Sequence, residues 1–296
     1  MQKSIGGYNS MGGWRLIASP VNGIRPSVVA NMLTNSYDLY YYDQSQSMEW
    51  INYKSNVFSL TSGKGYLIAN SNDVTLSFAG LLNNHNGAVT LDYVTEAEAP
   101  GWNLVGNPYP CNAYLAEQYF YVMNSVGDGI IAAESQVISP MQGIFVVTSN
   151  PNGETIHFTK ASMGSKSQVV INLLEGSSTG SVIDRAIISF DGGSTLEKFM
   201  LNEDGTKVYI AENGHDYAVV ARNDENSTPI SFKASQEGIY TFSVDIHNLD
   251  MDYLHLIDNE TGADIDLLQN LTYTFKATTT DNVNRFKVVY VTSLGK

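Results

Sequence analysis

Hydrophobic residues occur in short runs along most of the chain, and turn-forming residues separate the runs. Residues 74–78, Val-Thr-Leu-Ser-Phe, alternate strictly, and residues 66–69 are a continuous apolar run. Both patterns are typical of β-strands, the first with one buried face and the second with two. Helical spacing is found at residues 26–33, which begin with a proline, a residue favoured in a first helical turn. The pattern therefore predicts an all-β protein with one short helix near Pro26.

An aromatic run at residues 37–43 and a second run at 48–53 flank the polar segment 44–47. Two β-type runs on either side of a short polar turn predict a hairpin. The same reasoning predicts a second hairpin from residues 253–258 and 263–268, joined by Asn-Glu-Thr-Gly.

The segment 101–110, Gly-Trp-Asn-Leu-Val-Gly-Asn-Pro-Tyr-Pro, has a weaker copy at residues 13–20, Gly-Trp-Arg-Leu-Ile-Ala-Ser-Pro. Three later landmarks recur in the same order, so we predict an internal duplication with copies at about 12–80 and 100–161. Two copies are too few for a solenoid. They are either pseudo-symmetric halves of one β domain or two small β modules that share an interface. The recurring landmarks are 119–124 after the strand around Tyr40, 138–147 after 60–69, and 155–158 after 75–78.

A small, polar, glycine-containing stretch at residues 161–167 marks a linker, and we place a domain boundary near Gly164. Beyond it, many short β-rich runs are separated by turn signals such as Asn213-Gly214. This spacing is typical of a β-sandwich and not of alternating β-α-β units. We therefore expect a duplicated β domain at residues 1–163 and an antiparallel β-sandwich at residues 164–296.

The length of 296 residues is enough for two such domains. A net charge of −14, without a cluster of basic and aromatic residues, would repel a phosphate backbone, so we expect no nucleic-acid partner. Apolar runs are all much shorter than the roughly 20 residues that span a bilayer, so we expect no membrane insertion. Residues 1–7 have no apolar signal core; if the natural protein is exported, the chain is a mature fragment.

Four motifs in the first domain together resemble a module of large surface and secreted proteins of Bacteroidetes, many of them cargo of the type IX secretion system. The resemblance covers roughly residues 12–161, and Cys111 stands where the family usually has serine. The family is a structural and adhesin-like assortment without one shared activity. The resemblance thus implies architecture and a cell-surface or extracellular location more than chemistry. The motifs are GWNLVGNPYP at 101–110, YFYVMN at 119–124, ISPMQGIFVV at 138–147 and HFTKA at 157–161.

The sequence YLHLIDNETGADIDLL at residues 253–268, followed by YTFKA and RFKVVY, resembles the immunoglobulin-like β-sandwich that precedes the sorting domain of such proteins. This resemblance implies an immunoglobulin-like or jelly-roll-like antiparallel sandwich for the second domain. The sorting domain is absent from the sequence, so we expect a truncated chain or a relative that is exported otherwise.

A dense set of aromatic residues lies between residues 37 and 66, and alternation along the strands must leave some of them facing outward. Exposed aromatic rings stack on sugar faces or anchor protein partners. In the alternative, Trp14, Trp102, Leu39 and Tyr41 fill the core and the others are ordinary half-buried strand residues. The residues that we select as ligand-binding are Tyr40, Tyr42 and Trp50.

Carboxylates crowd residues 245–266, with Asn248 and Asn259 among them. Oxygen-rich loops suit calcium, although the spacing is not that of an EF-hand. A solvated acidic turn region is the alternative. The candidate calcium ligands are Asp250, Asp252, Asp258 and Asp264.

Sequence signatures of catalysis are missing. No phosphate-binding loop or nucleophile elbow occurs, and Cys111 has no nearby histidine and is expected to pack under the Asn-Pro turn. The histidines are scattered without metal-ligand spacing. They are His85, His157, His215, His247 and His255.

We therefore expect a non-enzymatic, adhesin-like protein that binds glycans or host or matrix proteins through exposed aromatic residues and loops. We expect no cofactor, and the only candidate ion is a structural calcium. The alternatives are a structural stalk of a larger exported protein and a polysaccharide-acting enzyme, which needs two carboxylates across a cleft. We expect any site on the strands and loops between the two copies of the Gly-Trp motif, and not in the motif itself.

Overall fold

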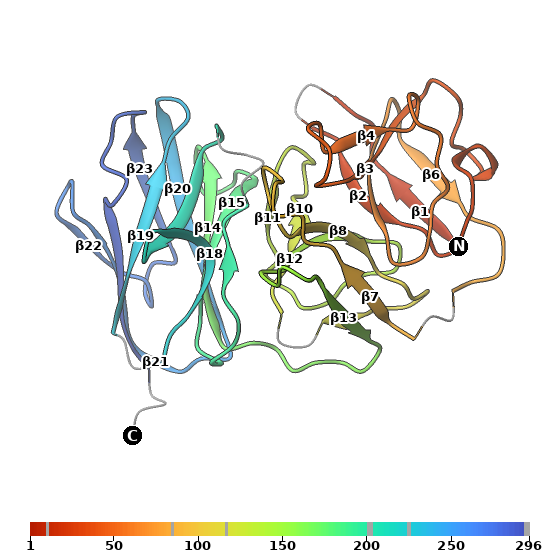
Figure 1. Ribbon diagram of the computed structural model, residues 1–296. Coiled ribbons are helices and arrows are strands. Elements are labelled where there is room, and N and C mark those ends of the chain that lie inside the picture. The colour runs from red at the N-terminus through yellow and green to blue at the C-terminus, as the bar shows by residue number, and fades with distance from the viewer. Residues whose placement is uncertain (10–11, 84–85, 116–117, 200–203, 224–225, 293–296) are drawn as a thin grey trace. The chain divides into compact units, whose positions relative to one another are not determined.

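The computed structural model describes all of residues 1–296 except 10–11, 84–85, 116–117, 200–203, 224–225 and 293–296. The described part consists of short strands and one helical turn, η1 (Pro26–Val28) (Figure 1). The all-β prediction is confirmed. Among the described residues no helix is long and apolar enough to cross a bilayer.

The helix predicted near Pro26 is a single 3-10 turn that ends at Val28. Val29 is already extended, with φ −76° and ψ 120°, and Ala30 pairs with Ser77. Pairing with a distant strand therefore replaces the second helical turn, and helical spacing in the sequence cannot reveal such a long-range competitor.

The chain forms two compact units, and the main division between them falls between Met163 and Gly164. Two short segments of the first half of the chain are grouped with the second unit. The first unit comprises Met1–Ala116, Phe120–Asp128 and Ser135–Met163; the second comprises Glu117–Tyr119, Gly129–Glu134 and Gly164–Lys296.

One four-stranded antiparallel sheet carries the first Gly-Trp motif and the predicted aromatic hairpin. Its order is β2-β5-β3-β4. Tyr42 pairs with Trp50 across the hairpin, which confirms that prediction. The inward residues Ile17, Leu39 and Ile68 are completely buried. The strands are β2 (Arg15–Ala18), β3 (Tyr37–Tyr42), β4 (Trp50–Asn52) and β5 (Gly65–Asn70).

In the first unit a second sheet carries the other Gly-Trp motif in the order β10-β12-β8. Leu104 lies opposite Phe145 in this sheet, as Leu16 lies opposite Leu67 in the first. Strand order and register are therefore the same for the predicted equivalent strands. The strands are β8 (Trp102–Gly106), β10 (Tyr121–Met123) and β12 (Gly143–Val147). Strand β11 (Ile130–Ala132) is grouped with the second unit.

The two Gly-Trp strands also make reciprocal contacts within the first unit. Ile17 pairs with Gln142, and Val105, which corresponds to Ile17, pairs with Lys64, which corresponds to Gln142. Reciprocal contacts of this kind are those of an interface with two-fold symmetry. The duplication itself stays a prediction from the sequence, and this arrangement is what pseudo-symmetric halves would require.

Two smaller sheets complete the first unit. One pairs β1 with β6, and the other has the order β7-β13-β9. The strands are β1 (Gln2–Ile5), β6 (Val74–Ser77), β7 (Ala88–Leu91), β9 (Tyr114–Leu115) and β13 (Glu154–Thr159).

The second unit contains one large sheet with a β-sandwich-like fold. Its path is β22-β21-β24-β19-β17-β18-β15-β14-β20-β23, with β16 beside β18. The predicted second hairpin is confirmed, because β21 pairs with β22. The strands are β14 (Gln168–Glu175), β15 (Val182–Ser189), β16 (Leu196–Glu197), β17 (Lys207–Glu212), β18 (His215–Ala221), β19 (Ser227–Lys233), β20 (Gly238–His247), β21 (Met251–Asp258), β22 (Ala263–Asp266), β23 (Thr272–Ala277) and β24 (Phe286–Thr292).

Aromatic rings dominate the core of this second unit. The ring centroid of Phe275 lies 4.7 Å from that of Phe286 and 5.1 Å from that of Phe232. Phe242 and Phe286 meet edge to face at 4.9 Å. Such contacts add about 1 kcal/mol each beyond the area that they bury, so this cluster contributes to the stability of the sandwich.

Candidate ligand-binding cleft

A cleft of about 710 Å³ lies within the first unit. Both Gly-Trp sheets contribute to it, through the end of β3 and through β8. Polar and tyrosine side chains are frequent in its wall. A concave surface of this size is the usual form of a small-ligand site. The lining segments are 41–45, 61–64, 88–94, 102–105 and 151–153.

Gln44 forms one side of the cleft and is 6% exposed. Its Nε2 donates to the carbonyl oxygens of Asp92 (2.8 Å) and Trp102 (3.1 Å), and its Oε1 accepts from the backbone N–H groups of Val94 (3.0 Å) and Gly101 (2.7 Å). Two donors and two acceptors are thus matched by one amide group. Gln44 therefore fixes the 92–102 loop against the end of β3.

Replacement of Gln44 by methionine is expected to lower the free energy of unfolding by about 2 kcal/mol, because four backbone groups lose their partner while the volume is retained. Chemical denaturation would measure the loss. Gln46→Met is the control, since Gln46 is exposed and its side chain bonds, among the residues described, only to Ser45. Equal stability of the two variants would show that Gln44 does not hold the loop.

Asn103 holds the same loop from the other side. Its Nδ2 donates to the carbonyl oxygens of Asp92 and Gly101, at 2.9 and 2.8 Å, and its Oδ1 accepts from the N–H of Asp92. The backbone of Asp92 is therefore fixed, while the residue is exposed at the wall of the cleft. This arrangement presents a carboxylate to a ligand on a rigid support.

Tyrosine rings supply the apolar part of the cleft. The ring of Tyr41 packs edge to face on Phe58 at 5.0 Å, and the Lys64 ammonium lies 5.5 Å from its centroid. Half-buried Tyr93 adds a second ring. Aromatic faces next to hydrogen-bonding groups can bind a ligand that has both apolar and polar surfaces.

Tyr42 lines the cleft and is held between two other rings, with Trp50 at 5.4 Å and Phe145 at 5.2 Å. The hydroxyl groups of Tyr42 and of Ser62, another lining residue, are buried and find no hydrogen-bond partner in the described part of the chain. Unsatisfied buried hydroxyls are uncommon in folded proteins.

The electrostatic environment of Tyr42 is negative. Burial raises the pKa of its hydroxyl, and the carboxylates of Glu49, Asp43 and Glu98 raise it further. Asp43 itself lines the cleft, and its Oδ1 accepts hydrogen bonds from the N–H and hydroxyl of Ser45.

The three aromatic residues selected from the sequence do not form an exposed platform. Tyr40 packs against Trp14 at 5.8 Å, and Trp50 packs against Phe145 at 5.8 Å. Both are half-buried, and neither lines the cleft. Of the three, the structure places only Tyr42 at the cleft.

Sequence reasoning missed Gln44, Asp92, Tyr93 and Asn103. Residues 88–94 do lie between the two copies of the motif, where a site was expected. The motif itself, where no site was expected, also contributes to the cleft, because Trp102–Val105 line it. The available signal was a polar residue, Asn103, between the buried Trp102 and Leu104 of a strand.

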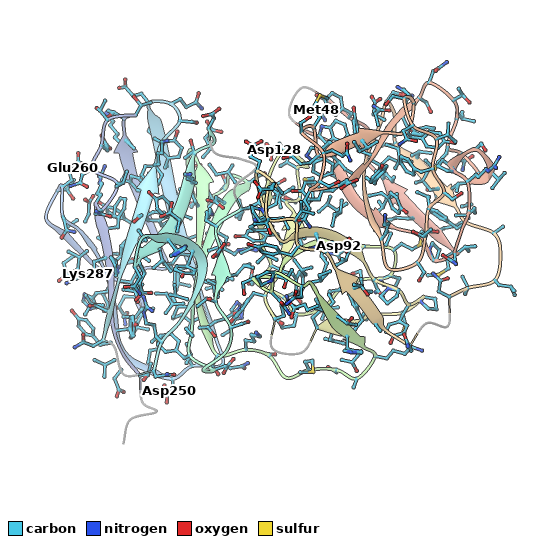
Figure 2. All side chains as sticks on the ribbon, viewed as in Figure 1. Met48, Asp92, Asp128, Asp250, Glu260 and Lys287 are labelled. Carbon is cyan, nitrogen blue, oxygen red and sulfur yellow. The ribbon has the colours of Figure 1, made fainter. Side chains whose placement is uncertain are left out.

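The four candidate calcium ligands are not brought together. Extended β21 puts Asp250 and Asp258 at opposite ends of an eight-residue strand, roughly 25 Å apart, and Figure 2 shows Asp250 far from Glu260, a neighbour of Asp258. Asp252 is exposed, and Oδ1 of Asp264 accepts a hydrogen bond from Nδ1 of His255 at 2.6 Å. In the described ranges no group of three or more His, Cys, Asp or Glu residues has a metal-binding arrangement.

Asp258 is instead paired with Arg285. Its two carboxylate oxygens lie 2.9 and 2.7 Å from Nε and Nη2 of the guanidinium, and Tyr273 donates a third hydrogen bond at 2.9 Å. Asp258 is completely buried, and Arg285 is 3% exposed. Both carboxylate oxygens of Asp258 are therefore occupied by hydrogen bonds within the core and are not available to a calcium ion.

The other candidate groups are separate from the cleft. His247 contacts Glu134 at 2.9 Å, and His85 lies outside the described residues. Cys111 is exposed, so the expectation that it packs under the turn is wrong. The backbone carbonyl of Cys111 accepts a hydrogen bond from Nδ2 of Asn107 at 2.9 Å, so the contact with the turn is made by the main chain and not by the thiol.

Comparisons with known proteins give no match to a family model, to a curated protein or to a solved structure. The likeness to Bacteroidetes surface proteins therefore rests on the residues of the sequence alone.

Proposed function

We propose that the chain is a non-enzymatic, adhesin-like binding protein that takes neutral carbohydrate in the cleft of the first unit. The observation that carries this proposal is the combination of tyrosine rings with fixed hydrogen-bonding groups in one concave surface. A sugar presents an apolar C–H face and a ring of hydroxyl groups, so it needs both kinds of contact. A cell-surface or secreted location is part of the proposal and is supported by the sequence resemblance only.

Local charge favours a neutral or basic ligand over an acidic one. Asp43 and Asp92 line the cleft, and Lys64 is the only Lys or Arg among the lining residues. The carboxylates of Glu49 and Glu98 add to the negative potential at Tyr42. A uronic or sialic acid would meet like charge there, and repulsion of this kind discriminates between partners.

The test uses Asp92, whose side chain is exposed in the cleft and whose backbone is held independently. Asp92→Ala is expected to weaken binding of a neutral polysaccharide about tenfold, because a hydrogen bond to a charged group contributes about 1.5 kcal/mol or more. Calorimetric titration and a glycan array would measure the change, while the thermal midpoint should stay within about 2 °C.

Glu96→Ala is the matched control, because Glu96 is exposed on the same loop, carries the same charge and lies outside the lining. Absence of saturable binding to neutral, basic and acidic polysaccharides alike would refute the proposal and favour a structural stalk. Release of new reducing ends from a bound polysaccharide would instead identify an enzyme.

A further inference from the structure

A lysine and an aspartate form a closed pair in the second unit, apart from the cleft. The Lys198 Nζ lies 2.6 Å from both carboxylate oxygens of Asp184. Lys198 is 4% exposed and Asp184 is 5% exposed. Asp184 belongs to β15, and Lys198 directly follows β16. The nitrogen and the carboxyl carbon are therefore held next to each other in the interior.

The surroundings of this pair disfavour its charges. An ammonium group has three N–H donors, and within the described structure Asp184 is the only residue that accepts a hydrogen bond from the Lys198 Nζ. Burial lowers the pKa of Lys198, although the Asp184 carboxylate opposes this effect. Transfer of one proton within the pair gives a neutral amine and a neutral carboxylic acid, which a dry interior tolerates better than two ions.

We propose that Lys198 and Asp184 condense to an intramolecular amide that cross-links the second unit. The nitrogen of the neutral amine attacks the carboxyl carbon of Asp184, and a C–N bond forms. A C–O bond then breaks, and the departing oxygen leaves as water with one proton from the carboxylic acid and one from the amine. The balance requires no oxidant, reductant or further reactant.

The structure supplies two aids to this reaction. The N–H of Val208 donates to Oδ2 of Asp184 at 2.8 Å, where it would stabilise negative charge on that oxygen during attack. The fold also holds amine and acid in contact, which makes the step effectively unimolecular. The product removes two buried charges, whereas the Asp258–Arg285 pair cannot follow this course because a guanidinium stays protonated.

The mass of the denatured, purified wild-type chain tests the proposal. We expect the measured mass to be lower than the mass calculated from the amino-acid sequence by the mass of one water molecule. Trypsin should not cleave after Lys198, so residues 167–185 and 186–207 should appear as one branched peptide. A salt bridge alone leaves the mass unchanged and releases residues 186–198 as a free peptide, and this outcome would overturn the proposal.

Two variants locate the bond. Lys198→Arg keeps a cation next to Asp184 but cannot form this amide, so its mass should equal that of its sequence. Lys207→Arg, on the neighbouring strand β17, should still lack one water molecule. Loss of water that persists in Lys198→Arg would assign the modification to other residues and would also overturn the proposal. Neither result depends on carbohydrate binding.

Discussion

Replacement of Gly101 by alanine is expected to lower the free energy of unfolding of the first unit by about 3 kcal/mol. Gly101 has a φ of +78°, which costs an alanine about 1 kcal/mol. A Cβ at this position would also lie 2.0 Å from the carbonyl oxygen of Thr148, so the backbone must shift, at a further cost of about 2 kcal/mol. The shift would disturb the hydrogen bond from the Gly101 N–H to Gln44.

Gly23→Ala is the matched control for this variant. Gly23 belongs to the same unit and has a φ of +70°, but a Cβ there would meet nothing within 4 Å. The free energy of unfolding of Gly23→Ala should fall only by the cost of the positive φ, about 1 kcal/mol. Urea denaturation followed by tryptophan fluorescence compares the two, and equal losses would mean that the close contact with Thr148 is unimportant. Gly101→Ala should also weaken carbohydrate binding, because the loop that carries Asp92 ends there.

Replacement of Asp258 by asparagine is expected to lower the free energy of unfolding of the second unit by about 3 kcal/mol or more. The change leaves the guanidinium of Arg285 in the interior without its main charged partner, and breaking a buried pair in this way is costly. Contacts of Arg285 with Glu260 at 3.2 Å and Asp281 at 3.1 Å limit the loss. Calorimetry of the purified variant would measure it.

The matched control is Asp264→Asn, on the other strand of the same hairpin. The Asp264 side chain is 57% exposed and is bound to His255. A surface pair of this kind contributes less than about 1 kcal/mol. A loss in Asp264→Asn as large as that in Asp258→Asn would show that the hairpin, and not the buried ion pair, is responsible.

The Asp258 pair also predicts acid sensitivity. Burial by itself raises the pKa of Asp258, but hydrogen bonds from Arg285, Tyr273 and the Glu260 N–H outweigh it and lower the pKa to about 2 from 3.8. Because the folded-state pKa is depressed, this stabilisation is complete above pH 3.8 and is lost as the pH falls towards 2. The free energy of unfolding should fall by about 2 kcal/mol over this pH range, and this pH dependence should be absent from Asp258→Asn.

Several elements followed from local pattern. The hairpin of β3 and β4 was predictable because an aromatic run, a polar turn and a returning run are adjacent in the sequence. Trp102 and Leu104 are buried, at 3% and 7% exposure, as their alternation with Asn103 predicted. These predictions succeeded because a period of two and a turn signal depend on neighbouring residues only.

Errors arose wherever a distant segment decides the outcome. Pairing of Ala30 with Ser77 ends the helix near Pro26. The covering of Trp50 by Phe145 removes the exposed aromatic platform. For the carboxylates, crowding in the sequence suggested proximity, but an extended strand separates Asp250 from Asp258 by its full length.

The Gly-Trp motif shows both sides of this division. In the copy at 101–110, alternation of apolar and polar side chains predicts a short strand with a buried tryptophan and leucine, and both are buried. In the copy at 13–20 the leucine is buried, but Trp14 precedes β2 and is half-buried. The motif's part in the candidate cleft could come only from the tertiary structure, which sets Asn103 beside Asp92 and Gly101 beside Gln44. Hydrogen bonds between residues far apart in the chain have no periodic signature, so a cleft built from them becomes visible only when the chain is folded.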